Sequence, residues 1–394
     1  MGTSGSRSGP VSVAVNLLWC DPGRVGGSEQ YLTRQLLGLA EVDPDAERIA
    51  ATIMASRRYV EAHPDLAERF AMRAPRWSMS RRPVRIAAEH LWLPAVRGPV
   101  DVVHHGGGTM PAGVTTRHAA TVLTIHDLQY LSYPEYFSRT RLRYLRSVVP
   151  RAAARATVIT TPSRYVADSV IDAFGIDAQR VVVVPHGLAT GELAARDADD
   201  HRTLLDEVRR RHGIGPGPFV VYPAITHPHK NHAVLIEALA DPSLARLQLV
   251  LIGGRGTAED EVVALIGRLG LSDRVIRTGR VSDAERDALI GGAEALVFPS
   301  RYEGFGAPVI EAMAAGTVVI ASDHRALVEV GGSAVVSLSP DDPAAWADAL
   351  GRLDDGREAR IRAGLDRARQ FEARVSAAAL IDAYELAARN RTGR

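Results

Sequence analysis

Two glutamates, Glu303 and Glu311, are separated by seven residues in a glycine-rich segment that follows a β-type run at 295–299. Pro308 suits the first position of a helix and Gly316 suits its end, so a short helix is predicted to begin between the two acids. Glu303 then lies in the loop before this helix, and Glu311 lies in its first turns.

The segment between the two acids offers backbone N–H groups as well as carboxylates. Gly304 and Gly306 flank Phe305, so the backbone there can approach a ligand closely. N–H groups suit phosphate oxygens, and carboxylates suit hydroxyl groups. A sugar nucleotide carries both, as a pyrophosphate and as vicinal diols. The alternative interpretation is that Glu303 and Glu311 only satisfy the helix dipole.

The chain contains a single lysine, Lys230. All the other residues counted among its 47 Lys+Arg are arginines. Lys230 follows a β-type run at 219–223 through a loop that includes Thr226 and His229, and Asn231 is a candidate N-cap for the next helix. A cation beside a helix N-terminus is unfavourable unless both share an anion. The pattern therefore favours a phosphate site at Lys230 over a solvated surface lysine.

Three β-type runs in the first half of the chain end in histidine, at His104-His105, His126 and His186. A buried histidine is often only a hydrogen-bonded structural residue, but the ends of parallel strands converge at one edge of a sheet. His126 is the first candidate for a functional role, because Asp127 follows it and a charged pair at a strand end is costly to bury.

Gly26 and Gly27 precede a helical pattern that starts near Ser28, with leucines at 32, 36 and 39. A glycine pair lets the backbone approach a ligand, and the helix N-terminus beyond it favours an anion. Both glycines are therefore candidate ligand-binding residues.

Other motifs carry less weight. Gly254-Arg255-Gly256 begins like a dinucleotide-binding fingerprint, but Glu259 stands at the position of its third glycine. Acidic pairs near 199, 341 and 354 lie in polar loops, and we expect no metal site there. The basic stretches at 57–58, 73–85 and 139–155 are either solvated faces or a surface for an anionic membrane or an acceptor diphosphate.

Composition narrows the class of protein. The 394 residues include 47 Lys+Arg against 46 Asp+Glu, which gives no reason to expect a nucleic-acid partner. The single cysteine, Cys20, excludes a disulfide framework and a thiolate metal cluster. We expect neither a signal peptide nor a membrane span, because no apolar run approaches the roughly 18 residues that a span needs.

Short β-type runs alternate with helical stretches along the chain, which predicts an α/β fold with two doubly wound parallel sheets. The predicted strands are 11–19, 48–55, 100–105, 121–126, 157–161 and 181–185, then 219–223, 247–253, 275–278, 295–299, 318–322 and 334–337. Ser282 and Glu285 form a capping box that opens one helix of the second series. With two such domains, ligands are expected in the cleft between them.

These motifs resemble the GT-B-fold family of retaining glycosyltransferases known as family 4. The resemblance runs from Gly26 to Asp323 and is most specific at Glu303 and Glu311, which match the paired glutamates of that family. Supporting segments are 124–128, 161–164, 184–187 and 229–231. The nearest subgroup looks like bacterial mannosyltransferases that build surface polysaccharides.

Composition and the order of elements divide the chain, and the resemblance assigns the acceptor and donor roles to its two domains. A disordered tail at 1–10 precedes a Rossmann-like acceptor domain at 11–190 and a linker with an exposed helix at 191–217. A Rossmann-like donor domain follows at 218–374. The helix at 375–394 has no strand after it and could pack on either domain, with packing back on the N-terminal domain as one option.

The resemblance also implies roles for the matching residues. Lys230 neutralises the donor pyrophosphate, and Glu311 holds the ribose hydroxyls. The catalytic candidates are His126, Lys230 and Glu303, and the donor-binding candidates are Gly26, Gly27, Thr226, His229, Arg280, Gly304, Phe305, Gly306 and Glu311. The family commonly has an arginine shortly before the lysine, and this chain has none there. His227, His229 or Arg280 is the expected substitute.

The implied reaction is transfer of a hexose from a nucleotide-diphosphate sugar to a glycan, lipid-linked or small-molecule acceptor. Anomeric configuration is retained without an enzyme nucleophile, a metal or a cofactor. Mannose from GDP-mannose is chosen by subgroup likeness alone. The alternatives are a sugar-nucleotide epimerase on the same fold, a non-catalytic sugar-nucleotide-binding protein and a glycoside hydrolase. We expect a cytoplasmic protein, with peripheral contact at the inner face of the membrane through the basic N-domain stretches as a further option.

Overall fold

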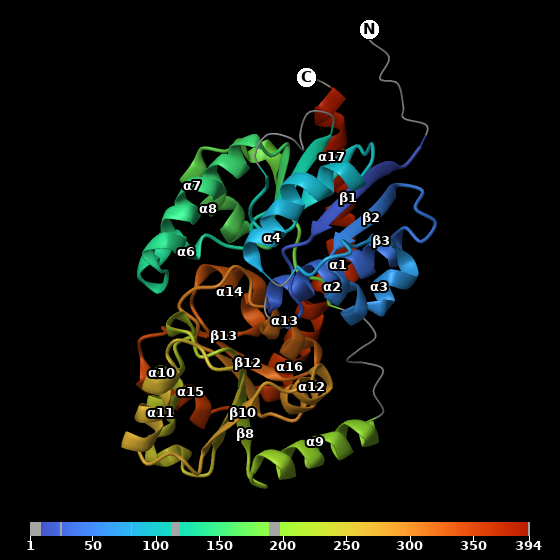
Figure 1. The fold of residues 1–394 in the computed structure, drawn as a ribbon. Coiled ribbons are helices and arrows are strands. Elements are labelled where there is room, and N and C mark those ends of the chain that lie inside the picture. Colours follow the sequence, from blue (N-terminus) through green and yellow to red (C-terminus); the bar gives the residue numbers. More distant parts are fainter. Residues whose placement is uncertain (1–8, 24–25, 80, 112–118, 189–197, 393–394) are drawn as a thin grey trace. The chain divides into compact units, whose positions relative to one another are not determined.

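The computed structural model describes residues 9–23, 26–79, 81–111, 119–188 and 198–392. The chain forms two compact units (Figure 1). Unit 1 comprises Met1–Gly187 together with Glu372–Arg394, and unit 2 comprises Leu188–Phe371.

Unit 1 contains a seven-stranded parallel sheet in the order β3-β2-β1-β4-β5-β6-β7. Its strands are β1 (Val11–Leu17), β2 (Ile49–Ala55), β3 (Ala71–Arg73), β4 (Val102–His105), β5 (Ala120–Thr124), β6 (Val158–Thr161) and β7 (Val181–Val183). Central strands such as β4 and β5 are buried along their whole length, as expected of a parallel sheet that is covered on both faces.

The helices of unit 1 surround this sheet (Figure 1). They are α1 (Gly27–Val42), α2 (Arg57–Ala62), α3 (Pro64–Arg69), α4 (Arg82–Ala87), the π-helical turn η1 (Ala88–Trp92), α5 (Leu93–Val96), α6 (Gln129–Ser132), η2 (Pro134–Tyr136), α7 (Arg139–Arg155), α8 (Arg164–Phe174), η3 (Ala178–Arg180) and α17 (Ala373–Thr392).

The last helix, α17, is part of the core of unit 1. Leu380, Ile381 and Tyr384 are at most 1% exposed and share one apolar cluster with β1 and α1. The Tyr384 hydroxyl also lies 2.8 Å from Nδ1 of His104 on β4. The chain therefore returns to its N-terminal unit after completing unit 2.

Unit 2 contains a six-stranded parallel sheet in the order β10-β9-β8-β11-β12-β13. Its strands are β8 (Phe219–Pro223), β9 (Gln248–Ile252), β10 (Val275–Gly279), β11 (Ala295–Phe298), β12 (Val318–Ser322) and β13 (Val336–Leu338). Both sheets have the crossover order of doubly wound folds, so the predicted fold class is confirmed.

The helices of unit 2 alternate with its strands. They are α9 (Ala198–His212), η4 (Pro228–Lys230), α10 (His232–Leu239), η5 (Pro242–Leu244), α11 (Glu259–Arg268), α12 (Asp283–Gly291), α13 (Ala307–Ala314), α14 (Arg325–Gly331), η6 (Gly332–Ala334), α15 (Pro343–Gly351), α16 (Arg357–Ala368) and η7 (Arg369–Phe371). The capping box at Ser282 and Glu285 is present at the start of α12.

Two local features differ from the sequence-based expectation, at β3 and at Asn231. The short edge strand β3 was not predicted, because it has three residues and lies in a basic stretch. The helix predicted in the linker is α9, whose side chains from 201 to 212 are exposed or half-buried apart from Val208, which is fully buried in the core of unit 2. Asn231 is the N-cap by position, but its side chain makes no capping hydrogen bond.

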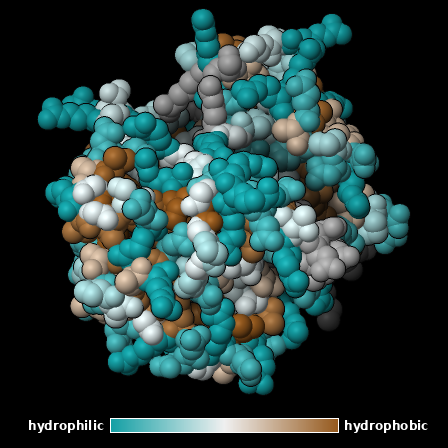
Figure 2. Space-filling model, turned by 90° about the horizontal axis from the view of Figure 1, so that it is seen from below, coloured by the Kyte–Doolittle hydropathy of each residue, from teal (hydrophilic) through white to brown (hydrophobic). Residues whose placement is uncertain are grey.

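One face of the molecule shows its polar character. The face seen in Figure 2 is dominated by hydrophilic side chains, with apolar side chains in small scattered areas. Within the residues that the structure describes, none of the helices combines the length and the apolar character needed to span a bilayer.

Candidate functional site

Lys230 and Glu303 form an ion pair in unit 2. The Nζ atom of Lys230 lies 2.6 Å from Oε1 of Glu303, and the two side chains are 20% and 13% exposed. The lysine follows β8 and the glutamate follows β11, and these strands are neighbours in the sheet. Their carboxyl ends therefore bring together two residues that are 73 positions apart.

The carboxyl group of Glu303 is ionised in this pair. Burial acts to raise the pKa of Glu303, but the Lys230 charge, its hydrogen bond and a hydrogen bond from Ser300 outweigh burial and lower this pKa. The Ser300 side chain is positioned by Tyr222, because the two hydroxyl groups lie 3.0 Å apart. Glu303 is thus a carboxylate that accepts hydrogen bonds.

Hydrogen bonds fix the loop that carries Lys230. The Tyr222 hydroxyl donates to the Lys230 carbonyl at 2.7 Å, and the Arg301 amide donates to the His229 carbonyl at 2.8 Å. Asn231 adopts a left-handed conformation with φ 54°. Its side-chain amide donates to the Pro340 carbonyl at 2.6 Å instead of capping α10, so the residue joins two loops.

Glu311 lies in α13 and is 5% exposed. Its Oε2 atom is 4.0 Å from Nη2 of Arg286 on α12. Burial acts to lower the pKa of Arg286, but Glu311, Asp287 and Asp283 outweigh it and raise this pKa. Sequence reasoning missed Arg286, because nothing in its local sequence indicates that it faces a glutamate 25 residues later.

The segment before α13 presents its backbone. Phe305 is 4% exposed, and its ring packs edge-on against Phe371 at 5.6 Å, so the side chain belongs to the core. Gly306 has φ 97°, and an added Cβ would lie 2.4 Å from Cδ2 of Leu327. Any ligand contact of the 304–306 segment would therefore come from its backbone.

Thr226 ties the loop after β8 to the loop after β9. Its hydroxyl donates to Glu259 at 2.7 Å and accepts from the Gly256 amide at 2.7 Å. An added Cβ on Gly256 would lie 2.3 Å from the Thr226 carbonyl oxygen. Gly256 of the rejected dinucleotide motif therefore serves close packing of two loops.

Two of the three candidates for the missing arginine, His229 and Arg280, differ in charge. Burial, with a smaller effect of the Lys230 charge, lowers the pKa of His229 to about 4. His229 is therefore neutral near pH 7 and offers a hydrogen bond but no charge. Arg280 is exposed and follows β10, with its Nε 3.2 Å from the position that a Cβ on Gly254 would occupy.

In unit 1, His126 lies just after β5 and is half-buried. Its Nε2 atom is 2.8 Å from the Gly106 carbonyl, to which it donates, so Nδ1 is left as the acceptor of the neutral ring. Tyr31 contacts this ring edge-on at 5.3 Å and contacts His186 at 4.5 Å. Burial lowers the pKa of His126.

The other strand-end histidines have structural partners. His104 lies between the hydroxyl groups of Tyr384 and Thr124, at 2.8 Å and 2.7 Å. His105 is fully buried, with its Nδ1 3.3 Å from the Asn16 amide nitrogen. The hydrogen-bonded structural interpretation therefore describes both of these residues.

Gly26 and Gly27 are exposed at the start of α1. Gly26 has φ 71°, and neither glycine has another atom within 4 Å of an added Cβ, so the space beside Gly27 is open. Glu29 fixes this region, because it accepts from the Gly23 amide at 3.1 Å and lies 3.0 Å from His63.

The candidate residues thus form two groups. His126, Gly26 and Gly27 lie in unit 1, and the remaining candidates lie in unit 2. Within unit 2 the structure brings Lys230 and Glu303 into contact and adds Arg286 beside Glu311.

Known families match both units. Residues 25–192 match "Glycosyltransferase Family 4", and residues 206–365 match "Glycosyl transferases group 1". The chain is 30% identical over 320 residues to O-antigen chain mannosyltransferase B of Escherichia coli, an alignment that covers 78% of this chain and 82% of the relative. The chain belongs to the GT-B glycosyltransferases of family 4.

This glycosyltransferase is also 31% identical to D-inositol 3-phosphate glycosyltransferase of Xylanimonas cellulosilytica, over 77% of this chain and 70% of the relative. Its fold matches Anabaena HepE in complex with UDP-glucose, with a TM-score of 0.71, 20% identity and coverage of 94% and 98% of the two chains. The predicted family and enzyme class are confirmed, and the protein transfers a sugar from a nucleotide sugar.

Proposed function

We propose that this glycosyltransferase transfers mannose from GDP-mannose to a hydroxyl group of a glycan, lipid-linked or small-molecule acceptor, with retention of anomeric configuration. The choice of mannose is supported by the names of two relatives, which are O-antigen chain mannosyltransferases. The observation that carries the reaction is the contact of the one lysine with Glu303 at the ends of two neighbouring strands.

In the proposed reaction, the bond between the anomeric carbon and the donor diphosphate breaks, and its electron pair goes to the diphosphate. The acceptor oxygen forms a new bond to the same face of the anomeric carbon, and its proton passes to the diphosphate. Lys230 stabilises the negative charge that builds on the leaving group, which acts in the transition state more than in the ground state.

The remaining candidates bind the donor in this proposal. Glu303 and the backbone of residues 304–306 bind the hexose, while Glu311 accepts hydrogen bonds from the ribose hydroxyls. Thr226, His229 and Arg280 shape the phosphate region. Unit 2 is then the donor domain and unit 1 the acceptor domain. Unit 1 contributes His126, whose Nδ1 accepts a hydrogen bond from the sugar. It also contributes the backbone of Gly26 and Gly27, which binds the phosphates.

We propose that no metal ion takes part, because the Lys230 ammonium provides the positive charge for the diphosphate. EDTA is therefore expected to leave the transfer rate unchanged, measured as nucleotide release with acceptor present. Loss of activity in EDTA that Mg²⁺ or Mn²⁺ restores would contradict this.

We also propose that the enzyme works in the cytoplasm, in peripheral contact with the inner face of the membrane. Helix α7 supports this contact because it carries several arginines and no acid. Its arginines are Arg139, Arg141, Arg143, Arg146, Arg151 and Arg155. Such a basic surface attracts anionic lipids.

A screen of nucleotide sugars tests the proposed function. A donor that binds only the folded state raises the melting temperature, and GDP-mannose is expected to raise it most. Transfer to an added glycan acceptor, followed by NMR of the product, then reports the anomeric configuration. Binding without transfer to any acceptor would indicate a sensor, and an epimerised sugar without acceptor would indicate an epimerase. Sugar release from a nucleotide-free glycoside would indicate a hydrolase.

A further inference from the structure

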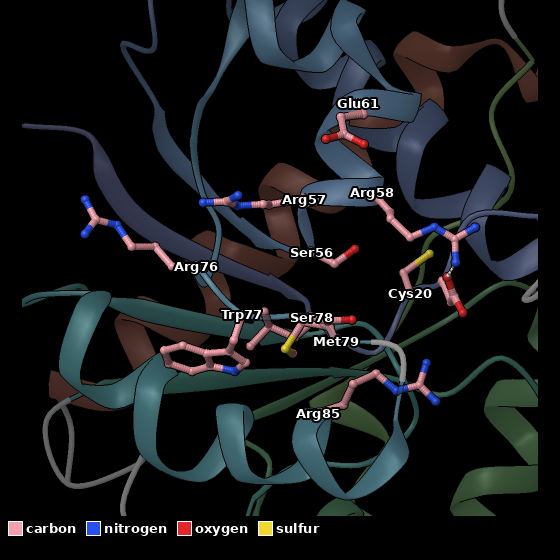
Figure 3. A pocket seen from close by; sticks show the side chains of 12 residues that line it. Cys20, Ser56, Arg57, Arg58, Glu61, Arg76, Trp77, Ser78, Met79 and Arg85 are labelled. Atoms are coloured by element: carbon pink, nitrogen blue, oxygen red, sulfur yellow. Dashed lines mark hydrogen bonds and ion pairs between the residues drawn. The ribbon is translucent and has the colours of Figure 1, made fainter.

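A cavity of about 280 Å³ lies in unit 1, where the loops that follow β1, β2 and β3 meet α4 (Figure 3). Its lining is rich in guanidinium groups, with four arginines against two acids. The arginines are Arg57, Arg58, Arg76 and Arg85, and the acids are Asp21 and Glu61. The cavity therefore has a net positive lining.

Two of these arginines have partners in the protein. Arg58 Nη1 lies 2.9 Å from Oδ1 of Asp21, and Arg85 Nη1 donates to the Trp19 carbonyl at 3.4 Å. No ion pair found among the described residues involves Arg57 or Arg76. Figure 3 shows these two extending to the side of the cavity on which Trp77 lies, whereas Arg58 and Arg85 extend to the side on which Cys20 lies.

The chemistry of such a lining suits a phosphate. A guanidinium group presents a planar fork of N–H donors that matches phosphate oxygens two at a time. A concave site in which positive charges outnumber negative ones also attracts an anion. The side chains of Arg57 and Arg76 are exposed. The two residues follow the neighbouring strands β2 and β3, respectively.

An apolar groove of about 560 Å³ adjoins this cavity. Val84, Ala88 and Leu91 recur at helical spacing along α4 and η1 and form one wall. Leu91 is 74% exposed, and Trp77, which is 49% exposed, lines both the groove and the arginine cavity. The charged hollow and the apolar hollow therefore share the side chain of Trp77 in their linings.

We propose that these two hollows together bind the acceptor, and that the acceptor is an amphiphile with a hydrocarbon chain joined to a phosphate or diphosphate. The phosphate occupies the cavity at Arg57 and Arg76, and the chain lies along Trp77 and Leu91. This inference rests on the proposed function and selects the lipid-linked class among its three acceptor classes. A neutral glycan would leave the arginines without a counter-charge, and a free phosphate would leave the groove empty.

Equilibrium binding to the full chain tests the proposal with three probes. They are farnesyl diphosphate, which has both parts, inorganic pyrophosphate, which has only the anion, and farnesol, which has only the chain. All are used as monomers in solution. Lys230→Ala is present throughout, so that diphosphate binding at the donor site is suppressed. Farnesyl diphosphate is expected to bind at least tenfold more tightly than either other probe.

Two variants locate the binding. Arg57→Ala with Arg76→Ala is expected to weaken farnesyl diphosphate and pyrophosphate at least tenfold and to leave farnesol unchanged. Leu91→Ser is expected to weaken farnesyl diphosphate several-fold and to leave pyrophosphate unchanged. The matched controls are Arg69→Ala with Arg268→Ala, which removes two exposed arginines elsewhere, and Val263→Ser on α11. The side chains changed in the test and control variants are exposed, so their melting temperatures should remain close to that of the Lys230→Ala parent.

The proposal is overturned if pyrophosphate binds as tightly as farnesyl diphosphate, which would indicate a small-molecule phosphate, or if the controls weaken binding as much as the test variants. Binding only to anionic vesicles, with no binding of monomeric farnesyl diphosphate, would indicate a membrane surface and would also overturn it. Failure of the proposed function has a different signature, because the unmodified enzyme would then turn over no nucleotide sugar.

Discussion

In the proposed reaction, the chemistry depends on Lys230 and Glu303. The ammonium and the carboxylate are 2.6 Å apart and mostly buried, so removal of one leaves the other with an unsatisfied charge. A donor diphosphate would give the lysine a second anionic partner. The pair is therefore both a structural contact and a charge that the leaving group can use.

Lys230→Ala is expected to lower kcat about 10²–10³-fold, or ~2.7–4 kcal/mol, if the ammonium acts like one oxyanion-hole donor. Steady-state turnover of the nucleotide sugar measures this effect. Arg268→Ala, which removes an exposed cation of α11, serves as the control. Near-normal turnover of a Lys230→Ala protein with an unchanged melting temperature would refute the assigned role.

Arg286 is a positioning residue for Glu311 in the same proposal. Arg286→Gln is expected to raise KM for the nucleotide sugar about tenfold, or ~1.4 kcal/mol, because Glu311 loses its orienting charge and the ribose binds less well. The value of kcat should change little, since ribose binding is equal in the ground state and the transition state. An equal loss in kcat with KM unchanged would contradict this role.

At the scale of elements, helix α17 closes unit 1 by packing against α1. Gly38 in α1 and Gly187 before unit 2 both face Ala373 at the start of α17. An added Cβ on Gly38 would lie 2.7 Å from the Ala373 carbonyl oxygen. The contact between the two helices thus requires a residue without a side chain.

Gly38→Ala is therefore expected to destabilise unit 1 by about 1–3 kcal/mol, because overpacking outweighs the better helix propensity of alanine. Gly267→Ala in α11 is the matched control, since no atom lies within 4 Å of its Cβ position. That change should stabilise its helix by about 0.5–1 kcal/mol. Urea denaturation of both variants measures the difference, and stabilisation by Gly38→Ala would show that the helices can separate without cost.

At the scale of the whole molecule, buried histidines make unit 1 sensitive to acid. Burial lowers the pKa of His104 to about 3, with smaller effects of His105 and His126, and burial lowers the pKa of His105 to about 3. An unfolded histidine has a pKa of about 6.5. The unfolded chain therefore binds more protons between these values, so the free energy of unfolding falls as the pH decreases below about 6.5.

His104→Gln is expected to reduce this pH slope by about 1.4 kcal/mol per pH unit between about pH 5.5 and 4.5. Urea denaturation is followed by tryptophan fluorescence in a Trp346→Phe background, because Trp346 lies in unit 2 and the remaining Trp19, Trp77 and Trp92 report unit 1. Tyr384→Phe is the control, because it removes a hydrogen-bond partner of His104 but keeps the imidazole, and its slope should stay unchanged. An unaltered slope in His104→Gln would mean that the ring is already protonated in the folded state.

The sequence alone predicted the family and the two parallel sheets, and it singled out Lys230 and the segment from Glu303 to Glu311 as candidate site residues. These features follow from local patterns, such as alternating β-type and helical runs, a capping box and the spacing of two acids. The three-residue strand β3 lacked such a pattern and was missed. At Asn231 the residue type suggested a cap, but tertiary contact gave the side chain a different partner.

Only the tertiary structure decided which distant residues meet. It brought α17 back to unit 1, packed α9 onto unit 2, placed Arg286 beside Glu311 and gathered arginines from three elements around one cavity. Each of these contacts joins segments far apart in the chain, and its free energy comes from burial and from charges that face each other. Local composition carries no information about such partners, whereas the order of strands and the packing of helices determine them.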